Sequence, residues 1–138
     1  MQRLKIYVSG PISGLPEANR SEFEDAAAMV RMAGADALIP HDVIPGHDGA
    51  CPQDTTRGTG GHSWACHLRA DLLAMLGCDG VVMVPGWEWS HGARLEHTVA
   101  AATGIPVHYL GEHGSIKTSS GSHLFEAVRD NAGEEVHA

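Results

Sequence analysis

A short apolar run, Val81-Val82-Met83-Val84, constrains the fold of this 138-residue chain more than any other feature. The run contains no polar residue, and Pro85-Gly86 ends it. A strand with one solvated face alternates apolar and polar residues, whereas a central parallel strand that is covered on both faces reads as continuously apolar. The run therefore predicts a parallel sheet with helices on both of its faces.

Extended and helical patterns alternate along the rest of the chain. We expect strands at about 4–8, 37–39, 81–84 and 105–110, and helices at about 21–34, 64–76 and 92–103. Ser21 and Glu24 have the spacing of a capping box, Ser63 can cap the second helix, and Pro106 indicates a peripheral last strand. This succession predicts one α/β domain over residues 1–138, a doubly wound, flavodoxin- or Rossmann-like three-layer α/β/α fold with strand order 2-1-3-4.

Two segments lack a core pattern. Residues 41–62 contain five glycines and two prolines, and no periodic element fits them. An irregular loop of this length in a small domain is usually either functional or disordered. Near the other end, residues 122–131 suit a terminal helix and residues 132–138 a frayed tail.

Composition narrows the classes of partner. The formal net charge of −8 argues against a nucleic-acid polymer or an anionic membrane surface as the main partner. No apolar run approaches the roughly 20 residues needed to span a bilayer, and the first residues do not resemble a signal peptide. Three cysteines, an odd and sparse set, favour the reducing cytoplasm. We therefore expect a cytoplasmic protein that binds a small molecule, which can carry a phosphate held by local loops.

The expected strand order predicts where that molecule binds. Between the first and third strands the chain reverses its direction across the sheet, and ligands of such folds bind outside the carboxyl ends of those strands. The loop after the first strand, Ser9-Gly10-Pro11-Ile12-Ser13-Gly14, offers backbone N–H groups and hydroxyls to an anion. An ordinary strand-to-helix turn explains it equally well, since it matches neither a Walker A loop nor the dinucleotide pattern. Arg20, just beyond, can pair with a phosphate or remain solvated.

The loop after the third strand, residues 85–96, has the more unusual composition. Trp87 and Trp89 flank an acid there, and Ser90 and Gly92 begin a helix whose N-terminus favours an anion. Glu96 lies about one turn into that helix. It is either an exposed glutamate that answers the helix dipole or a carboxylate placed at the end of the sheet.

Two further side chains are candidates for the same site. Asp71 falls beside the apolar stripe of the second helix, where a carboxylate is costly unless it is paired, for example with Arg69, or functional. Tyr7, late in the first strand, either directs its hydroxyl into the cleft or is a core tyrosine with one satisfied hydroxyl.

Histidines and cysteines, which are common metal ligands, lie in and next to the irregular 41–62 loop. Candidate ligands are His47, Cys51, His62, Cys66 and His67. Their spacing fits no zinc signature well, so the sequence predicts no metal site.

Several of these residues form an ordered set that resembles a known superfamily. Tyr7-Val8-Ser9-Gly10-Pro11, Asp71, Cys78-Asp79 before an apolar strand, and Ser90-x-Gly92-x-x-x-Glu96 together resemble the nucleoside 2-deoxyribosyltransferase superfamily. Residues 86–96 are similar to the Gly-Trp-Glu-x-Ser-x-Gly-Ala-x-x-Glu stretch of its often phage-encoded DUF4406 branch.

The resemblance implies a reaction and a set of roles. Glu96 would attack the anomeric carbon of a nucleoside 5′-monophosphate and form a covalent sugar ester, which water then releases. Asp71 would orient or protonate the departing base, and Tyr7 would position the nucleophile. We therefore expect a nucleoside 5′-monophosphate N-glycosidase that is a homodimer and needs no metal or organic cofactor. The residues expected to contact substrate or phosphate are Ser9, Gly10, Pro11, Ile12, Ser13, Arg20, Asp79, Trp87, Ser90 and Gly92.

The chain also departs from the superfamily pattern. Transferases of the superfamily end with an asparagine and aromatic segment that grips the sugar's 5′-hydroxyl, and residues 111–138 offer serines instead (Ser115, Ser119, Ser120 and Ser122). This difference favours hydrolysis of a nucleotide. Base exchange by a deoxyribosyltransferase and nucleotide binding without turnover are the alternatives. Trp87 and Trp89 could stack on a base or cover a subunit contact.

Overall fold

Four parallel strands form the centre of the computed structural model, which describes residues 3–46, 51, 61–111 and 116–118. The strands are β1 (Lys5–Ser9), β2 (Asp36–Leu38), β3 (Gly80–Met83) and β4 (Val107–Leu110), in the order β2-β1-β3-β4. The predicted parallel sheet and its strand order are confirmed. A further strand, β5 (Ile116–Thr118), pairs antiparallel with β4.

The prediction that the 105–110 strand lies at the sheet edge is wrong, because β5 covers it. Pro106 precedes the strand instead of interrupting it. Its carbonyl oxygen accepts a hydrogen bond from the Val81 N–H at 3.0 Å, so the residue still contributes to the pairing between β3 and β4.

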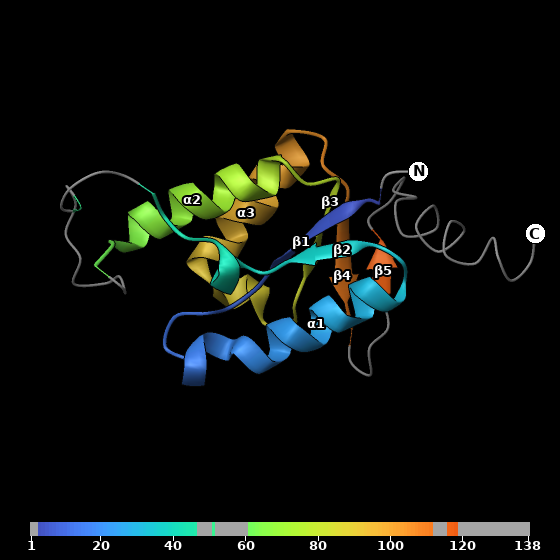
Figure 1. Ribbon diagram of the computed structural model, residues 1–138, viewed down its shortest axis with the longest axis horizontal. Coiled ribbons are helices and arrows are strands. Elements are labelled where there is room, and N and C mark those ends of the chain that lie inside the picture. The colour runs from blue at the N-terminus through green and yellow to red at the C-terminus, as the bar shows by residue number, and fades with distance from the viewer. Residues whose placement is uncertain (1–2, 47–50, 52–60, 112–115, 119–138) are drawn as a thin grey trace, which may run out of the picture.

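Helices cover both faces of the sheet, as Figure 1 shows: α1 (Arg20–Met32) lies on one side, and α2 (Trp64–Leu76) and α3 (His91–Ala102) lie on the other. Short 3-10 turns lie before α1 at Pro16–Asn19, after β2 at Pro40–Asp42 and before α3 at Trp87–Trp89. This is the expected three-layer α/β/α architecture. No helix of the described ranges has the length and apolar character required to cross a membrane. The expected terminal helix at 122–131 and tail at 132–138 lie outside the described residues.

The helices begin in two different ways. Ser63 and Ser90 cap α2 and α3 with hydrogen bonds from N–H groups three residues on, at 3.0 and 3.2 Å. The predicted capping box at Ser21 is wrong, because Ser21 lies inside α1. The chain enters α1 through three left-handed residues, 17–19, and the side-chain amide of Asn19 donates to the Pro11 carbonyl at 3.0 Å. The loop itself therefore fixes the start of α1.

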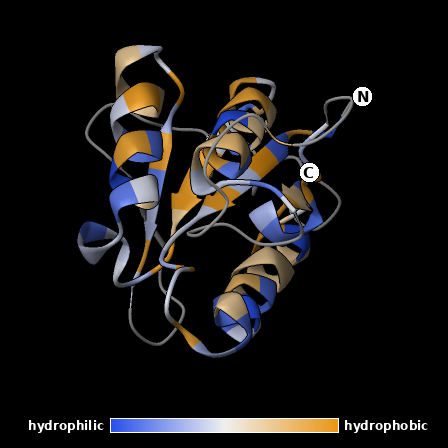
Figure 2. Cartoon of the chain, turned by 90° about the vertical axis from the view of Figure 1, so that its left-hand side faces the viewer, coloured by the Kyte–Doolittle hydropathy of each residue, from blue (hydrophilic) through white to orange (hydrophobic). Residues whose placement is uncertain are grey.

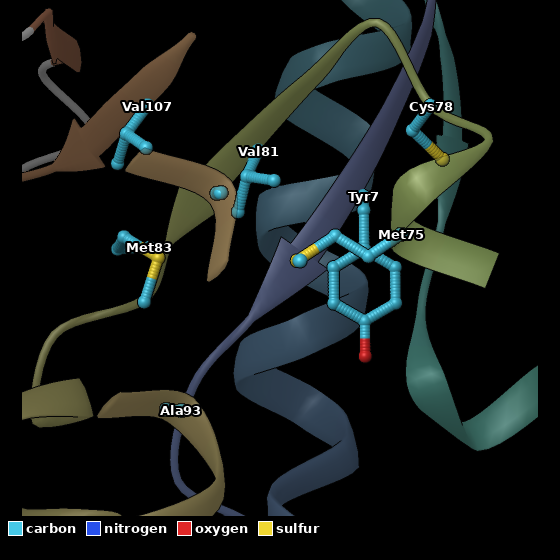
Figure 3. Packing of buried hydrophobic residues seen from close by; sticks show 8 residues of the cluster. Tyr7, Met75, Cys78, Val81, Met83, Ala93 and Val107 are labelled. Atoms are coloured by element: carbon cyan, nitrogen blue, oxygen red, sulfur yellow. The ribbon is translucent and has the colours of Figure 1, made fainter. Parts of the chain in front are cut away.

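Side chains of β1 point alternately to the two faces of the sheet, so this strand contributes to the core on both sides. Ile6 and Val8 face α1, whereas Tyr7 packs against Met75 of α2 and Ala93 of α3. In Figure 3 the Tyr7 ring lies beside Met75 and its hydroxyl points away from Cys78. Figure 2 shows hydrophobic colouring along the strands, while the helices alternate hydrophobic and hydrophilic positions. Because strand side chains repeat with a period of two, Ser9 faces the same layer as Tyr7.

Candidate active site

Glu96 is the central residue of the candidate site. It follows Ala93 by three residues and precedes Ala100 by four, so all three lie on the face of α3 that packs against the sheet. Only 5% of Glu96 is exposed. It is therefore not the solvent-facing glutamate that the helix dipole alone would explain.

Two hydroxyl groups of β1 hold both oxygens of this carboxylate. The Tyr7 hydroxyl donates to Glu96 Oε2 at 2.8 Å, and the Ser9 hydroxyl donates to Oε1 at 2.6 Å. Tyr7 and Ser9 are themselves completely buried. Ser9, which we expected among the residues that contact phosphate, is thus a hydrogen-bond partner of Glu96. The arrangement fixes the orientation of the carboxylate and favours its ionised form.

The surroundings change the acidity of three groups in this site. Burial raises the pKa of Glu96, while the hydrogen bonds from Ser9 and Tyr7 oppose that rise. Burial, and then the charge of Glu96, raise the pKa of Asp71 to about 8. The pKa of Tyr7 is raised well above its ordinary value by burial and by the charges of Glu96 and Asp71. The phenol therefore stays protonated and remains a donor to Glu96.

The hydrogen bonds distinguish Glu96 from Asp71, because the two donors oppose the rise of the Glu96 pKa, whereas burial and the charge of Glu96 raise the pKa of Asp71 to about 8. Asp71 is a neutral acid within electrostatic reach of Glu96, whose ionised form is held by two donors. The expected alternative, an ion pair with Arg69, does not form, since the ion pairs in the described part of the chain join Arg3 to Asp36 and Arg20 to Glu24. Two neighbouring carboxyls whose surroundings push their pKa values apart can supply a proton donor and a nucleophile to one reaction.

The two predicted loops meet at the carboxyl ends of β1 and β3. A Cβ atom on Gly86 would lie 3.3 Å from Pro11 Cγ, so the loops are in contact. A Cβ atom on Gly10 would lie only 2.7 Å from the Cβ of Val84, which makes glycine a packing requirement there. Ser90 caps α3 through the Ala93 N–H. A Cβ atom on Gly92 would lie 3.8 Å from the Trp64 ring. A ligand contact of these glycines and of Ser90 stays a prediction.

Four other predicted binding residues lie in different surroundings. Asp79 belongs to the opposite end of the sheet, where its carboxylate accepts from the N–H of Lys5, the first residue of β1; its assignment to the site is wrong. Ile12 packs with the core cluster on the α1 side. Ser13 is exposed in a turn, and Arg20 is exposed and pairs with Glu24 of its own helix at 3.1 Å.

The two tryptophans of the second loop have different environments. The Trp87 ring stacks on the His97 ring, with centroids 4.4 Å apart, and His97 Nε2 is hydrogen-bonded to the Tyr109 hydroxyl at 2.7 Å. One face of Trp87 is thus already occupied. Trp89 is 91% exposed. A hollow of about 560 Å³ beside Trp87 contains neither Glu96 nor Asp71; its lining residues are Pro85, Gly86, Trp87, Glu88, Tyr109, Leu110 and Gly111.

A second cluster of side chains lies at the start of α2. Donor atoms of Cys51, His62 and Cys66 all lie within 4.8 Å of one another. The rings of His62 and His67 are 5.9 Å apart, while His47 lies outside the described residues. The structure thus gathers three of the five residues whose spacing gave no zinc signature. The approach of Cys51 to the start of α2 is a tertiary contact, which the spacing of the residues does not encode.

Comparison with known protein families classifies the segment from β1 to β4, which builds the candidate site. No curated protein matches the chain. The model of one family, described as a domain of unknown function (DUF4406), matches residues 4–109, which include Tyr7, Asp71 and Glu96. The chain belongs to the DUF4406 family.

Proposed function

We propose that the protein hydrolyses the N-glycosidic bond of a (deoxy)nucleoside 5′-monophosphate. The observation that carries this proposal is a pair of carboxyls: the buried Glu96, with both oxygens bound by hydroxyl donors, and the half-buried Asp71, with a pKa raised to about 8. The motifs that resemble the nucleoside 2-deoxyribosyltransferase superfamily supply the substrate class.

The pair suits a double displacement at the anomeric carbon. The Glu96 carboxylate forms a bond to that carbon as the carbon–nitrogen bond breaks, and the neutral Asp71 transfers its proton to the departing base. The Asp71 carboxylate then takes a proton from water, whose oxygen attacks the same carbon and releases Glu96. Free base and sugar phosphate are the products, and both carboxyls return to their starting states.

The phosphate of the substrate would lie where the two loops meet. The N-terminus of α3, capped by Ser90, offers N–H groups and the positive end of the helix dipole to an anion. Gly92 lies in the first turn of this helix and Gly10 follows β1. These three residues match the phosphate-contacting group of the nucleotide-hydrolase branch.

The proposal also includes a cytoplasmic homodimer that acts on a nucleotide without a cofactor. Trp89 is the exposed aromatic side chain that a second copy would cover, since burial of a large aromatic ring contributes strongly to an interface. Light scattering of the wild type and of Trp89→Ser tests this part: a dimer that the substitution weakens is expected.

The experiment that tests the reaction is a screen of ribo- and deoxyribonucleoside monophosphates for release of free base, read by chromatography. Release is expected with the wild type, and Glu96→Gln should lower the rate by at least about a thousandfold. Glu22→Gln, a change at an exposed glutamate of α1, is the control and should keep the rate.

The same screen separates the alternatives. Exchange when a second free base is added would identify a deoxyribosyltransferase. Thermal stabilisation by a nucleotide with no release of base from any of the series would favour a binding module and contradict the proposal.

A further inference from the structure

The cluster at the start of α2 consists of two thiols and one imidazole. Cys66 is the third residue of the helix, His62 precedes the Ser63 cap, and Cys51 approaches from eleven residues earlier than His62. All three ligand residues are half-buried, and the cysteines are thiols rather than disulfides. The cluster is separate from the carboxyl pair, and the proposed reaction does not use it.

The distances in the cluster suit a tetrahedral metal ion. Zinc bonds of about 2.3 Å to sulfur and about 2.0–2.1 Å to nitrogen set S···N edges of about 3.5 Å and S···S edges of about 3.8 Å in a tetrahedron. Cys66 Sγ and His62 Nδ1 are 3.4 Å apart, and no pair of the donor atoms is separated by more than 4.8 Å. Shifts of about 1 Å or less would bring all three onto one ion.

The local backbone supports thiolate ligands at these positions. The Ser63 N–H donates to Cys51 Sγ at 3.5 Å, which is the kind of contact that stabilises a metal-bound sulfur. The Ser63 hydroxyl lies 3.6 Å from the same sulfur and also accepts from the Cys66 N–H. Cys66 itself lies in the first turn of α2, four residues after His62, so the start of the helix holds its Sγ beside the imidazole.

We propose that Cys51, His62 and Cys66 bind a zinc ion, with the fourth position left to water or to a further donor. Two thiolates and an imidazole are a ligand set that selects zinc over magnesium or calcium. Binding releases the two thiol protons and adds no redox step. The ion joins the end of the irregular 41–62 segment to α2, the helix that carries Asp71.

The test is the metal content of the full chain, purified under reducing conditions with zinc and then dialysed. One zinc per chain is expected by elemental analysis. Cys51→Ser and Cys66→Ser should each lose most of it. Cys78→Ala, which removes the buried cysteine that follows α2, is the matched control and should keep it.

Cobalt gives a readout that does not depend on how well a variant folds. Cobalt added to the folded, metal-free wild type should produce the thiolate-to-cobalt charge-transfer absorption of a tetrahedral site, and zinc should displace it. Three outcomes overturn the proposal: no zinc and no cobalt absorption in a wild type whose circular dichroism shows it folded, zinc retained equally by the Cys51 and Cys66 variants, or a Cys51–Cys66 disulfide that persists in reductant.

Discussion

Asp71 should make the stability of the protein depend on pH. Its pKa is about 8 in the folded state and about 3.8 when the side chain is solvated. A carboxyl with a higher pKa when folded binds its proton more tightly in the folded state. The stability it contributes is therefore present at low pH and is lost as pH rises from about 4 towards about 8.

The size of the effect follows from that window. Each pH unit within it costs about 1.4 kcal/mol of unfolding free energy, which gives an upper limit of about 3 kcal/mol between about pH 5 and about pH 7. Asp71 is partly exposed, so screening and relaxation reduce this value. We expect the wild type to lose about 1–2 kcal/mol more than Asp71→Asn over this range.

Urea denaturation of both proteins across that pH range, at constant ionic strength, measures the difference. Groups common to both proteins contribute to both curves and largely cancel. Asp25→Asn, a change at an exposed carboxylate of α1, is the control and should follow the wild type. Parallel curves for the wild type and Asp71→Asn would refute the reasoning, because they would mean that Asp71 is ionised and solvated in the folded protein.

Three other substitutions test separate features. Tyr7→Phe removes a hydrogen-bond donor that lowers the pKa of Glu96. The value of kcat should therefore fall about tenfold to a hundredfold, and the acid limb of the pH–rate profile should move to higher pH. An unchanged profile would exclude this positioning role. Gly10→Ala would place a Cβ atom 2.7 Å from the Cβ of Val84, so it should lower the free energy of unfolding, measured with heat or urea, by about 1–3 kcal/mol. Gly46 has open space around its Cβ position, so Gly46→Ala should change this free energy by less than about 0.5 kcal/mol. Burial lowers the pKa of His108 to about 4, so the unfolded chain binds a proton first and stability falls as pH drops from about 6.5 towards about 4; His108→Gln should flatten that fall in urea titrations, and an equal fall would disprove it.

The sequence predicted the parts of the fold that repeat a simple pattern. The apolar run of β3 and the alternation of strands and helices were sufficient for the parallel sheet and its order. The three-residue strand β5 was missed, because a segment this short carries no periodic signal before β4 pairs with it. The edge position assigned to residues 105–110 failed for the same reason.

For the candidate site, the sequence indicated some of the residues and misassigned or missed others. The motifs indicated Glu96, Asp71 and Tyr7, and the structure places these three within one electrostatic network. The contact of Ser9 with Glu96 could have been found from the period of two that puts it on the same strand face as Tyr7. Asp79 was misplaced, because proximity to a motif in sequence does not reveal at which end of a strand a residue lies.

The two hydroxyls that hold Glu96 belong to Tyr7 and Ser9, which precede it in the chain by 89 and 87 positions. No local segment can therefore assemble this carboxylate environment; it exists only while the first strand and the third helix are docked across the same sheet. A partly denatured molecule that keeps its helices but loosens the packing between these elements returns Glu96 to water. Any function of this carboxylate should consequently disappear before the helical content does, which makes it a sensitive reporter of native tertiary structure.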